Sequence, residues 1–154
     1  MIRCFVVDVD GVLACSRHRD ERTEQWLCSG DLLCTDNYNR IMYLYEEERN
    51  SYRQVANVRH EIIIVTGRHE HYRPDTISWL TRHQIWFDGL LMRRDNDRQP
   101  TASYKVATAR FLQSTGRTIA LAFDDRDDVI AGYRAEKIPT MKMKPPFPNE
   151  SKKK

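Results

Sequence analysis

Five short runs of apolar residues alternate along the chain with longer segments in which apolar positions recur at helical spacing. The runs are rich in Val and Ile and end at Gly, Asp or Arg, which is typical of buried strands. They cover residues 2–7, 61–65, 87–92, 118–123 and 138–143. Helices are predicted between them, over about residues 36–57, from Pro74 onward, over 102–113 with Gly116 closing it, and over 128–136.

This alternation predicts an α/β fold of Rossmann-like, three-layer α/β/α type, with a mainly parallel sheet covered on both faces. At 154 residues the chain fits one domain, which we expect over residues 1–143. Residues 14–35 are predicted to form only a short, cap-like insertion, so the cap over any site would be minimal and the site open. Residues 144–154 combine prolines and lysines and are predicted to be a disordered basic tail.

Composition narrows the class of protein without identifying it. A hydrophobic content of 40% and the lack of an apolar run near the roughly 18 residues of a membrane helix predict a soluble protein with no membrane partner. Asp8 and Asp10 interrupt the apolar N-terminus, which argues against a signal peptide, so we expect a cytoplasmic protein. A net charge of +3 suits a polyanionic substrate but does not by itself indicate nucleic acid.

The four cysteines are expected to be reduced thiols, since the default for a cytoplasmic protein is no disulfide framework. A zinc site is the alternative, and its ligands would be Cys15, His18, Cys28 and Cys34. Their spacing lacks the paired C-x-x-C of structural zinc sites, so zinc is the weaker hypothesis.

Polar residues that could carry chemistry follow three of the predicted strands. Asp8 and Asp10 follow the first, Thr66 the second, and Asp124 with Asp125 the fourth. Ligands of open α/β sheets lie beyond the carboxyl ends of the strands, so these side chains are predicted to converge on one site. Asp8 and Asp10 would project to the same side of an extended chain. These residues also have purely structural alternatives. Asp8 and Asp10 could form an ordinary acidic turn, Thr66 could cap a helix, and Lys105 could be a solvated surface residue.

The order of these residues resembles a known family. The segment Asp8-Val9-Asp10-Gly11-Val12-Leu13 resembles the first motif of the haloacid dehalogenase (HAD) phosphatases, and Thr66, Lys105 and Asp124-Asp125 match the other three motifs in order. More narrowly, the chain resembles the phosphatase domain of phage-type polynucleotide kinase/phosphatase. That likeness rests on Val65-Thr66-Gly67-Arg68, Met92-Arg93-Arg94-Asp95, Lys105 and Phe123-Asp124-Asp125-Arg126.

The resemblance implies a role for each motif residue. Asp8 would be the nucleophile, and Asp10 the acid that protonates the leaving oxygen and then activates water. Mg²⁺ would be held by Asp8, the backbone carbonyl of Asp10 and Asp124, with Asp125 in support. Thr66 and the N–H of Gly67 would donate to the phosphoryl group, and Lys105 would neutralise its charge.

Substrate binding is expected from arginines. Arg68 would grip phosphate oxygens, with a surface ion pair as its alternative. Arg93 and Arg94 are candidates for a nucleotide contact, although a solvated Arg/Asp loop explains them equally well. An arginine from the loop after the first motif is also expected, and Arg17, Arg19 and Arg22 are the candidates.

These observations predict a Mg²⁺-dependent phosphatase that acts through an aspartyl-phosphate on nucleotide or nucleic acid phosphates, with polynucleotide 3′-phosphates preferred. A 5′-nucleotidase acting on mononucleotides is the enzymatic alternative. A non-catalytic module that binds phosphate or nucleic acid is the alternative of another class. The chain has no G-x-x-x-x-G-K-[ST] phosphate loop, so a repair role would need a separate kinase or repair partner.

Overall fold

The computed structural model describes residues 1–15 and 31–144. Its main sheet has five strands in the order β5-β4-β1-β6-β7, and every neighbouring pair is parallel. The strands are β1 (Ile2–Val7), β4 (Arg59–His69), β5 (Gly89–Arg93), β6 (Arg117–Asp124) and β7 (Thr140–Lys142). Two short antiparallel strands, β2 (Ala14–Cys15) and β3 (Leu32–Leu33), form a separate small sheet.

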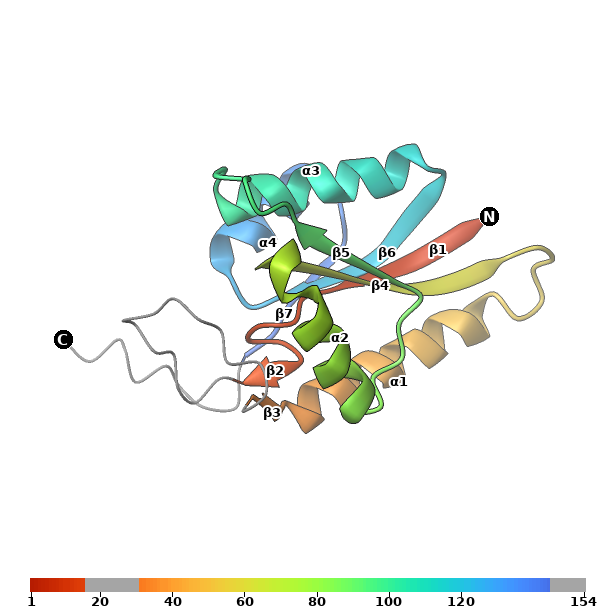
Figure 1. Cartoon of the computed structure of the whole chain (residues 1–154). Helices are drawn as coiled ribbons and strands as arrows, with labels where there is room; N and C mark the ends of the chain where they lie inside the picture. Colours follow the sequence, from red (N-terminus) through yellow and green to blue (C-terminus); the bar gives the residue numbers. More distant parts are fainter. Residues whose placement is uncertain (16–30, 145–154) are drawn as a thin grey trace.

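Helices cover both faces of the main sheet (Figure 1). One face packs against α1 (Thr35–Ser51) and α2 (Arg73–Arg82), which follows the short 3₁₀ turn η2 (Glu70–Tyr72). The other face packs against α3 (Thr101–Ser114) and α4 (Asp127–Ala135). The predicted three-layer α/β/α fold with a mainly parallel sheet is therefore confirmed.

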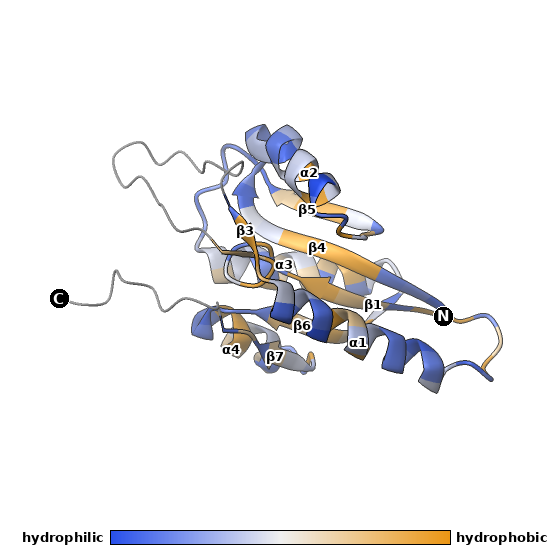
Figure 2. Cartoon of the chain, turned by 90° about the horizontal axis from the view of Figure 1, so that it is seen from below, coloured by the Kyte–Doolittle hydropathy of each residue, from blue (hydrophilic) through white to orange (hydrophobic). Residues whose placement is uncertain are grey.

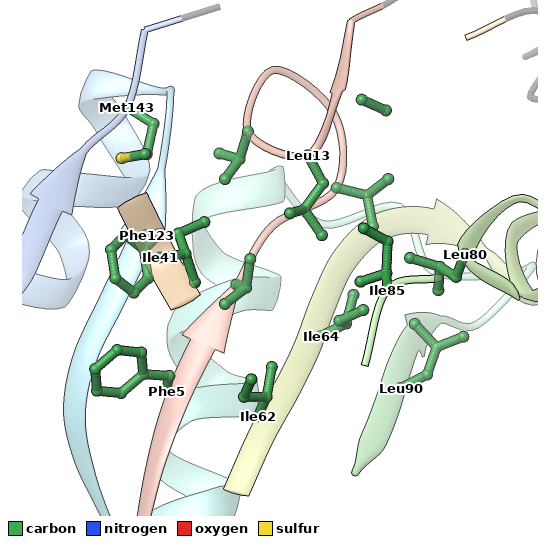
Figure 3. Packing of buried hydrophobic residues seen from close by; sticks show 14 of the residues in the cluster. Phe5, Leu13, Ile41, Ile62, Ile64, Leu80, Ile85, Leu90, Phe123 and Met143 are labelled. Carbon is green, nitrogen blue, oxygen red and sulfur yellow. The ribbon is translucent and has the colours of Figure 1, made fainter. Parts of the chain in front are cut away.

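Alternating side chains of the strands feed two hydrophobic cores. Phe5 and Val7 of β1 pack with Ile41 of α1 and Trp79 of α2, whereas Val6 packs toward the opposite layer. Figure 2 shows hydrophobic residues concentrated along the central strands, and Figure 3 shows part of the cluster between the sheet and α1. Strands that are buried on both faces explain why the sequence shows continuous apolar runs instead of strict alternation.

The register of β1 determines where Asp8 lies. Val7 pairs with Ile64 on one side and with Phe123 on the other. Asp8 follows directly, and its backbone N–H donates to the Phe123 carbonyl oxygen at 3.2 Å. Asp8 is thus held next to the end of β6, where Asp124 begins the acidic pair.

Two predicted boundaries are wrong. The strand predicted to stop at residue 65 continues to His69, because pairing with β5 resumes at His69 and Arg93 after a register shift. The helix predicted over 36–57 ends at Ser51 and passes into turns that lead to Asn57, whose φ is +60°. Val55 does not extend the apolar face of that helix, since it is half exposed.

The expectation of reduced thiols is wrong for two of the cysteines. Cys15 and Cys34 form a disulfide, with their Cα atoms 6.0 Å apart. The pairing of β2 with β3 brings them together, because Cys15 lies opposite Leu32 and the N–H of Cys34 donates to Leu13 O at 2.7 Å. Both are therefore unavailable as zinc thiolates in this structure, and His18 and Cys28 lie outside the described residues.

The predictions of a cap-like insertion, of an arginine from its loop and of a disordered basic tail concern mostly residues outside the described ranges. Most of the cap-like insertion, including Arg17, Arg19 and Arg22, falls there, as does most of the basic tail. The domain limits stay a prediction. Across residues 1–15 and 31–144, none of the helices combines the length and the apolar character needed to cross a bilayer.

Candidate active site

Three carboxylates meet at the carboxyl edge of the sheet. Asp8 and Asp124 are buried, with 4% and 1% of their surface exposed, and Asp125 is half-buried. One oxygen of each lies within 4.8 Å of the others. So close a group of like charges is stable only when cations or protons compensate it.

Lys105 supplies part of this compensation. Its Nζ lies 2.9 Å from Asp8 Oδ1 and donates to Asp124 Oδ2 at 2.5 Å. The side chain is almost fully buried, because α3 packs over the sheet and directs this residue toward the strand ends. The surface position that we considered for Lys105 is therefore wrong.

The pKa values reflect this burial. Desolvation alone lowers the pKa of Lys105, but the Asp8 and Asp124 carboxylates outweigh it and hold this pKa above its ordinary value. Burial raises the pKa of Asp8 well above its usual range, and Lys105 offsets only part of that rise. Burial and the neighbouring Asp124 raise the pKa of Asp125 to about 6. One lysine is too little positive charge for this cluster.

The loop after Asp8 depends on Gly11. Its φ of +81° is a conformation that residues with a side chain rarely adopt. A Cβ atom there would lie 2.1 Å from Asp125 Oδ2. The turn is closed by the N–H groups of Leu13 and Ala14, which both donate to the Val9 carbonyl oxygen. Gly11 therefore permits both the turn and the position of Asp125.

Asp10 is held by Arg68 in a two-point ion pair. Arg68 Nε donates to Asp10 Oδ2 at 2.9 Å, and Nη2 donates to Asp10 Oδ1 at 2.6 Å. The same Nη2 also donates to Asp31 Oδ2 at 3.0 Å, and Arg68 is 2% exposed. The geometry orients Asp10, whereas the sequence indicated a phosphate contact for Arg68. Sequence analysis did not identify Asp31, because it belongs to no motif and lies 37 residues from Arg68 in the chain.

Thr66 and Gly67 lie within the long strand β4 and not in a loop after it. Thr66 is fully buried, and its Oγ1 accepts a hydrogen bond from the backbone N–H of Arg68 at 3.2 Å. A hydroxyl that accepts one hydrogen bond still has its own proton to donate. Gly67 lies against Thr101 at the start of α3, since a Cβ at Gly67 would be 3.3 Å from Thr101 Cγ2.

The two neighbouring arginines after β5 differ in environment. Arg93 is buried, and its Nη1 donates to Thr101 Oγ1 at 3.4 Å. Arg94 is exposed. Arg93 is therefore enclosed by neighbouring residues, whereas Arg94 lies at the surface.

A divalent metal ion fits this cluster. Oxygen atoms from carboxylates are the ligands that Mg²⁺ prefers, and Asp8, Asp124 and Asp125 offer them within one ion's reach of one another. Among the described residues, the side chain of Asp10 is not part of this group, because Arg68 holds it. A metal role for Asp10 would therefore use its backbone carbonyl, as predicted.

Comparison with known protein families decides the assignment. The chain matches the polynucleotide kinase PNKP phosphatase domain over residues 2–146. It belongs to this family. It is accordingly a phosphatase of the HAD type, and the resemblance recognised in the motifs is confirmed.

Solved structures agree on the fold. Similar chains occur in the Pnkp1/Rnl/Hen1 RNA repair complex, at 23% identity with a TM-score of 0.69, where the match covers 94% of this chain and 43% of that one. The chain thus spans less than half the length of that neighbour. The HAD domain of the effector protein Lem4 from Legionella pneumophila is 15% identical with a TM-score of 0.50, and the match covers 96% of this chain and 90% of that one. Among curated proteins, none matches.

Proposed function

We propose that this PNKP-family phosphatase removes terminal phosphate from nucleic acid strands, with 3′-phosphates preferred, through a covalent intermediate on Asp8. The observation that carries the proposal is the contact of the buried Asp8 with Lys105 beside Asp124 and Asp125. A buried carboxylate at the end of a central strand, with a lysine that can neutralise an incoming anion, is suited to nucleophilic attack on phosphorus.

In the first step, an Asp8 oxygen attacks phosphorus while the bond from phosphorus to the sugar oxygen breaks. Asp10 gives its proton to that leaving oxygen. In the second step, Asp10 takes a proton from water, the water oxygen attacks phosphorus, and the bond from phosphorus to Asp8 breaks. Inorganic phosphate leaves and both carboxyl groups return to their initial states.

The other residues position these groups. Arg68 holds Asp10 in a fixed orientation, Lys105 holds Asp8 and attracts the phosphoryl oxygens, and the Thr66 hydroxyl and the Gly67 N–H donate to those oxygens. Asp8, Asp124 and Asp125 would hold a Mg²⁺ ion, which supplies positive charge between the attacking carboxylate and the anionic phosphate. The carbonyl oxygen of Asp10 would be a further ligand.

Support for nucleic acid as substrate comes from the family and from the setting of one structural neighbour. The family is the phosphatase domain of a polynucleotide kinase, and the neighbour belongs to an RNA repair complex. A kinase or repair partner that phosphorylates or joins the ends is part of this proposal, and the 154 residues contain no G-x-x-x-x-G-K-[ST] phosphate loop.

The test is phosphate release in Mg²⁺ from a 3′-phosphorylated oligonucleotide, its 5′-phosphorylated counterpart, and 3′- and 5′-mononucleotides. We expect the 3′-phosphorylated oligonucleotide to have the highest kcat/KM, and Asp8→Asn to reduce release by about 10⁴-fold or more, because the variant lacks the nucleophile. Asp75→Asn, an exposed position on α2, is the matched control and should retain full activity.

Other outcomes have distinct meanings. Faster release from 5′-mononucleotides would make the protein a nucleotidase. An absence of release from every substrate, with oligonucleotide binding retained, would refute the catalytic proposal and indicate a binding module.

A further inference from the structure

The guanidinium of Arg93 lies at the start of α3, and Asp97 is the carboxylate that lies within ion-pair distance of it among the described residues. The residue is 8% exposed. Its hydrogen bond to the neutral Thr101 hydroxyl is long, at 3.4 Å, and its Nη2 lies 3.6 Å from Asp97 Oδ1, beyond normal hydrogen-bond distance. Within the part of the chain that the structure describes, its Nε has no hydrogen-bond partner.

Asp97 does not serve as a full counter-ion for Arg93. The backbone N–H of Gln99 donates to Asp97 Oδ1 at 2.9 Å, and the Gln99 amide donates to Oδ2 at 2.8 Å. This carboxylate is therefore engaged within its own loop. A buried arginine in such a position is destabilising unless an anion joins it.

Two further groups at this place also favour an anion. His69 is the register partner of Arg93 across β4 and β5, and its Nε2 is buried without a hydrogen-bond partner among the described residues. Helix α3 begins at Thr101 after Pro100 and, over the same residues, has no side-chain cap. The first N–H groups of a helix and its positive dipole end attract anions, phosphates in particular.

The start of α3 can be located relative to the proposed nucleophile Asp8. Thr101 precedes Lys105 by one helical turn, about 6 Å along the axis. Gly67 touches Thr101, and Lys105 contacts Asp8. The contacts of Arg93 with Thr101, Asp97 and the ring of Tyr104 place it along the first turn of α3, which comes just before Lys105 in the chain. One turn of helix is comparable to the separation of neighbouring phosphates in an extended strand.

We propose that Arg93, His69 and the start of α3 bind the phosphodiester that precedes the terminal phosphate of the substrate strand. This inference rests on the proposed function and deepens it, because it explains how a strand is distinguished from a mononucleotide. Arg93 is then a specificity residue, and a nucleoside 3′-monophosphate leaves its subsite empty.

The experiment compares three substrates that differ only at this position. They are a nucleoside 3′-monophosphate, a dinucleotide 3′-phosphate, and the same dinucleotide with a neutral methylphosphonate link. For wild type we expect kcat/KM to be roughly ten- to a hundredfold higher for the charged dinucleotide than for the other two, in line with a charge-assisted hydrogen bond. In Arg93→Gln this advantage should vanish while the rate on the monophosphate stays within about twofold.

Two variants keep the test specific. Arg98→Gln removes the same charge from an exposed position of the same loop and should keep the advantage of the charged dinucleotide. Arg93→Lys keeps the charge without the two-point guanidinium geometry and should retain part of that advantage.

Three results would overturn the subsite. They are an equal loss on all three substrates in Arg93→Gln, an equal effect of Arg98→Gln, and a wild type that hydrolyses the methylphosphonate dinucleotide as fast as the charged one. An equal loss on all three substrates would indicate a structural role for Arg93. An equal effect of Arg98→Gln would indicate that the positive charge of the loop attracts the substrate without a specific subsite. A wild type that hydrolyses none of the three substrates would instead contradict the proposed function.

Discussion

Position 11 requires glycine for two reasons. Its φ is positive, and a Cβ atom there would collide with Asp125. Gly11→Ala should therefore destabilise the protein by more than the roughly 1 kcal/mol of the backbone conformation alone, and should displace Asp125. We expect loss of most phosphatase activity and a smaller stabilisation by Mg²⁺ in thermal unfolding.

Gly116→Ala is the matched control for this prediction. Gly116 has a similar φ of +87°, but among the described residues other than its two chain neighbours no atom lies within 4 Å of its hypothetical Cβ. It should lose stability by about 1 kcal/mol and keep its activity and its response to Mg²⁺. Equal activity in the two variants would show that the contact with Asp125 is unimportant.

For individual residues, the sequence predicted which side chains lie in the candidate site better than it predicted what they contact there. The placing of Asp8, Asp124 and Asp125 at one edge follows from strand order alone. The ion pair of Arg68 with Asp10 does not, because an arginine after Thr66 and Gly67 suits a phosphate contact equally well. Such a choice depends on tertiary distances that no local pattern encodes.

Helix α3 brings the positive charge of Lys105 to the buried carboxylates Asp8 and Asp124. Lys105→Met removes the cation that contacts both Asp8 and Asp124 and leaves these buried carboxylates uncompensated. In EDTA we expect a loss of about 3 kcal/mol in unfolding free energy, measured in urea. Because an added cation restores the missing charge, Mg²⁺ should stabilise the variant more than it stabilises wild type.

Lys144→Met provides the comparison, since the Lys144 side chain is exposed and is not one of the three groups in this ion pair. It should unfold like wild type with or without Mg²⁺. A Lys105→Met protein as stable as wild type in EDTA would mean that Lys105 contributes nothing to holding the carboxylates.

The elements themselves were mostly predictable. Apolar runs located the five strands of the main sheet because parallel strands are buried on both faces. The pattern failed at the end of β4, where Thr66, Gly67 and Arg68 are typical of a turn, yet pairing at His69 keeps the strand extended. Pairing with a partner strand outweighs local propensity there. The disulfide was missed for a related reason, since the proximity of Cys15 and Cys34 arises from pairing of β2 with β3.

For the whole molecule, the acidic edge predicts opposite effects of pH on the metal-free and the metal-bound protein. The raised pKa values of Asp8 and Asp125 mean that the folded protein holds protons there more tightly than the unfolded chain does. For Asp125 this contribution to stability is fully present below about pH 4 and is lost as pH rises through about 6, and for Asp8 it changes in the same direction. In EDTA, these groups should therefore make the protein less stable at pH 7 than at pH 5.

Mg²⁺ competes with the same protons, so its stabilisation should grow from pH 5 to pH 7. Thermal unfolding at both pH values, with Mg²⁺ or EDTA, measures the two trends. Asp125→Asn should weaken both, whereas Asp36→Asn, an exposed position on α1, should leave them unchanged. A Mg²⁺ effect that is independent of pH would contradict the assignment of these carboxylates as ligands.

The central position of β1 also has a consequence for how the molecule forms. This strand, which ends just before the proposed nucleophile Asp8, is made before its partners in the sheet, which begin at Arg59 and Arg117. Closing such long loops is slow, and a ribosome must release nearly the whole domain before β1 is flanked on both sides. Asp8 therefore remains without Lys105, Asp124 and Asp125 while most of the domain is synthesised, and the candidate active site is a late product of folding.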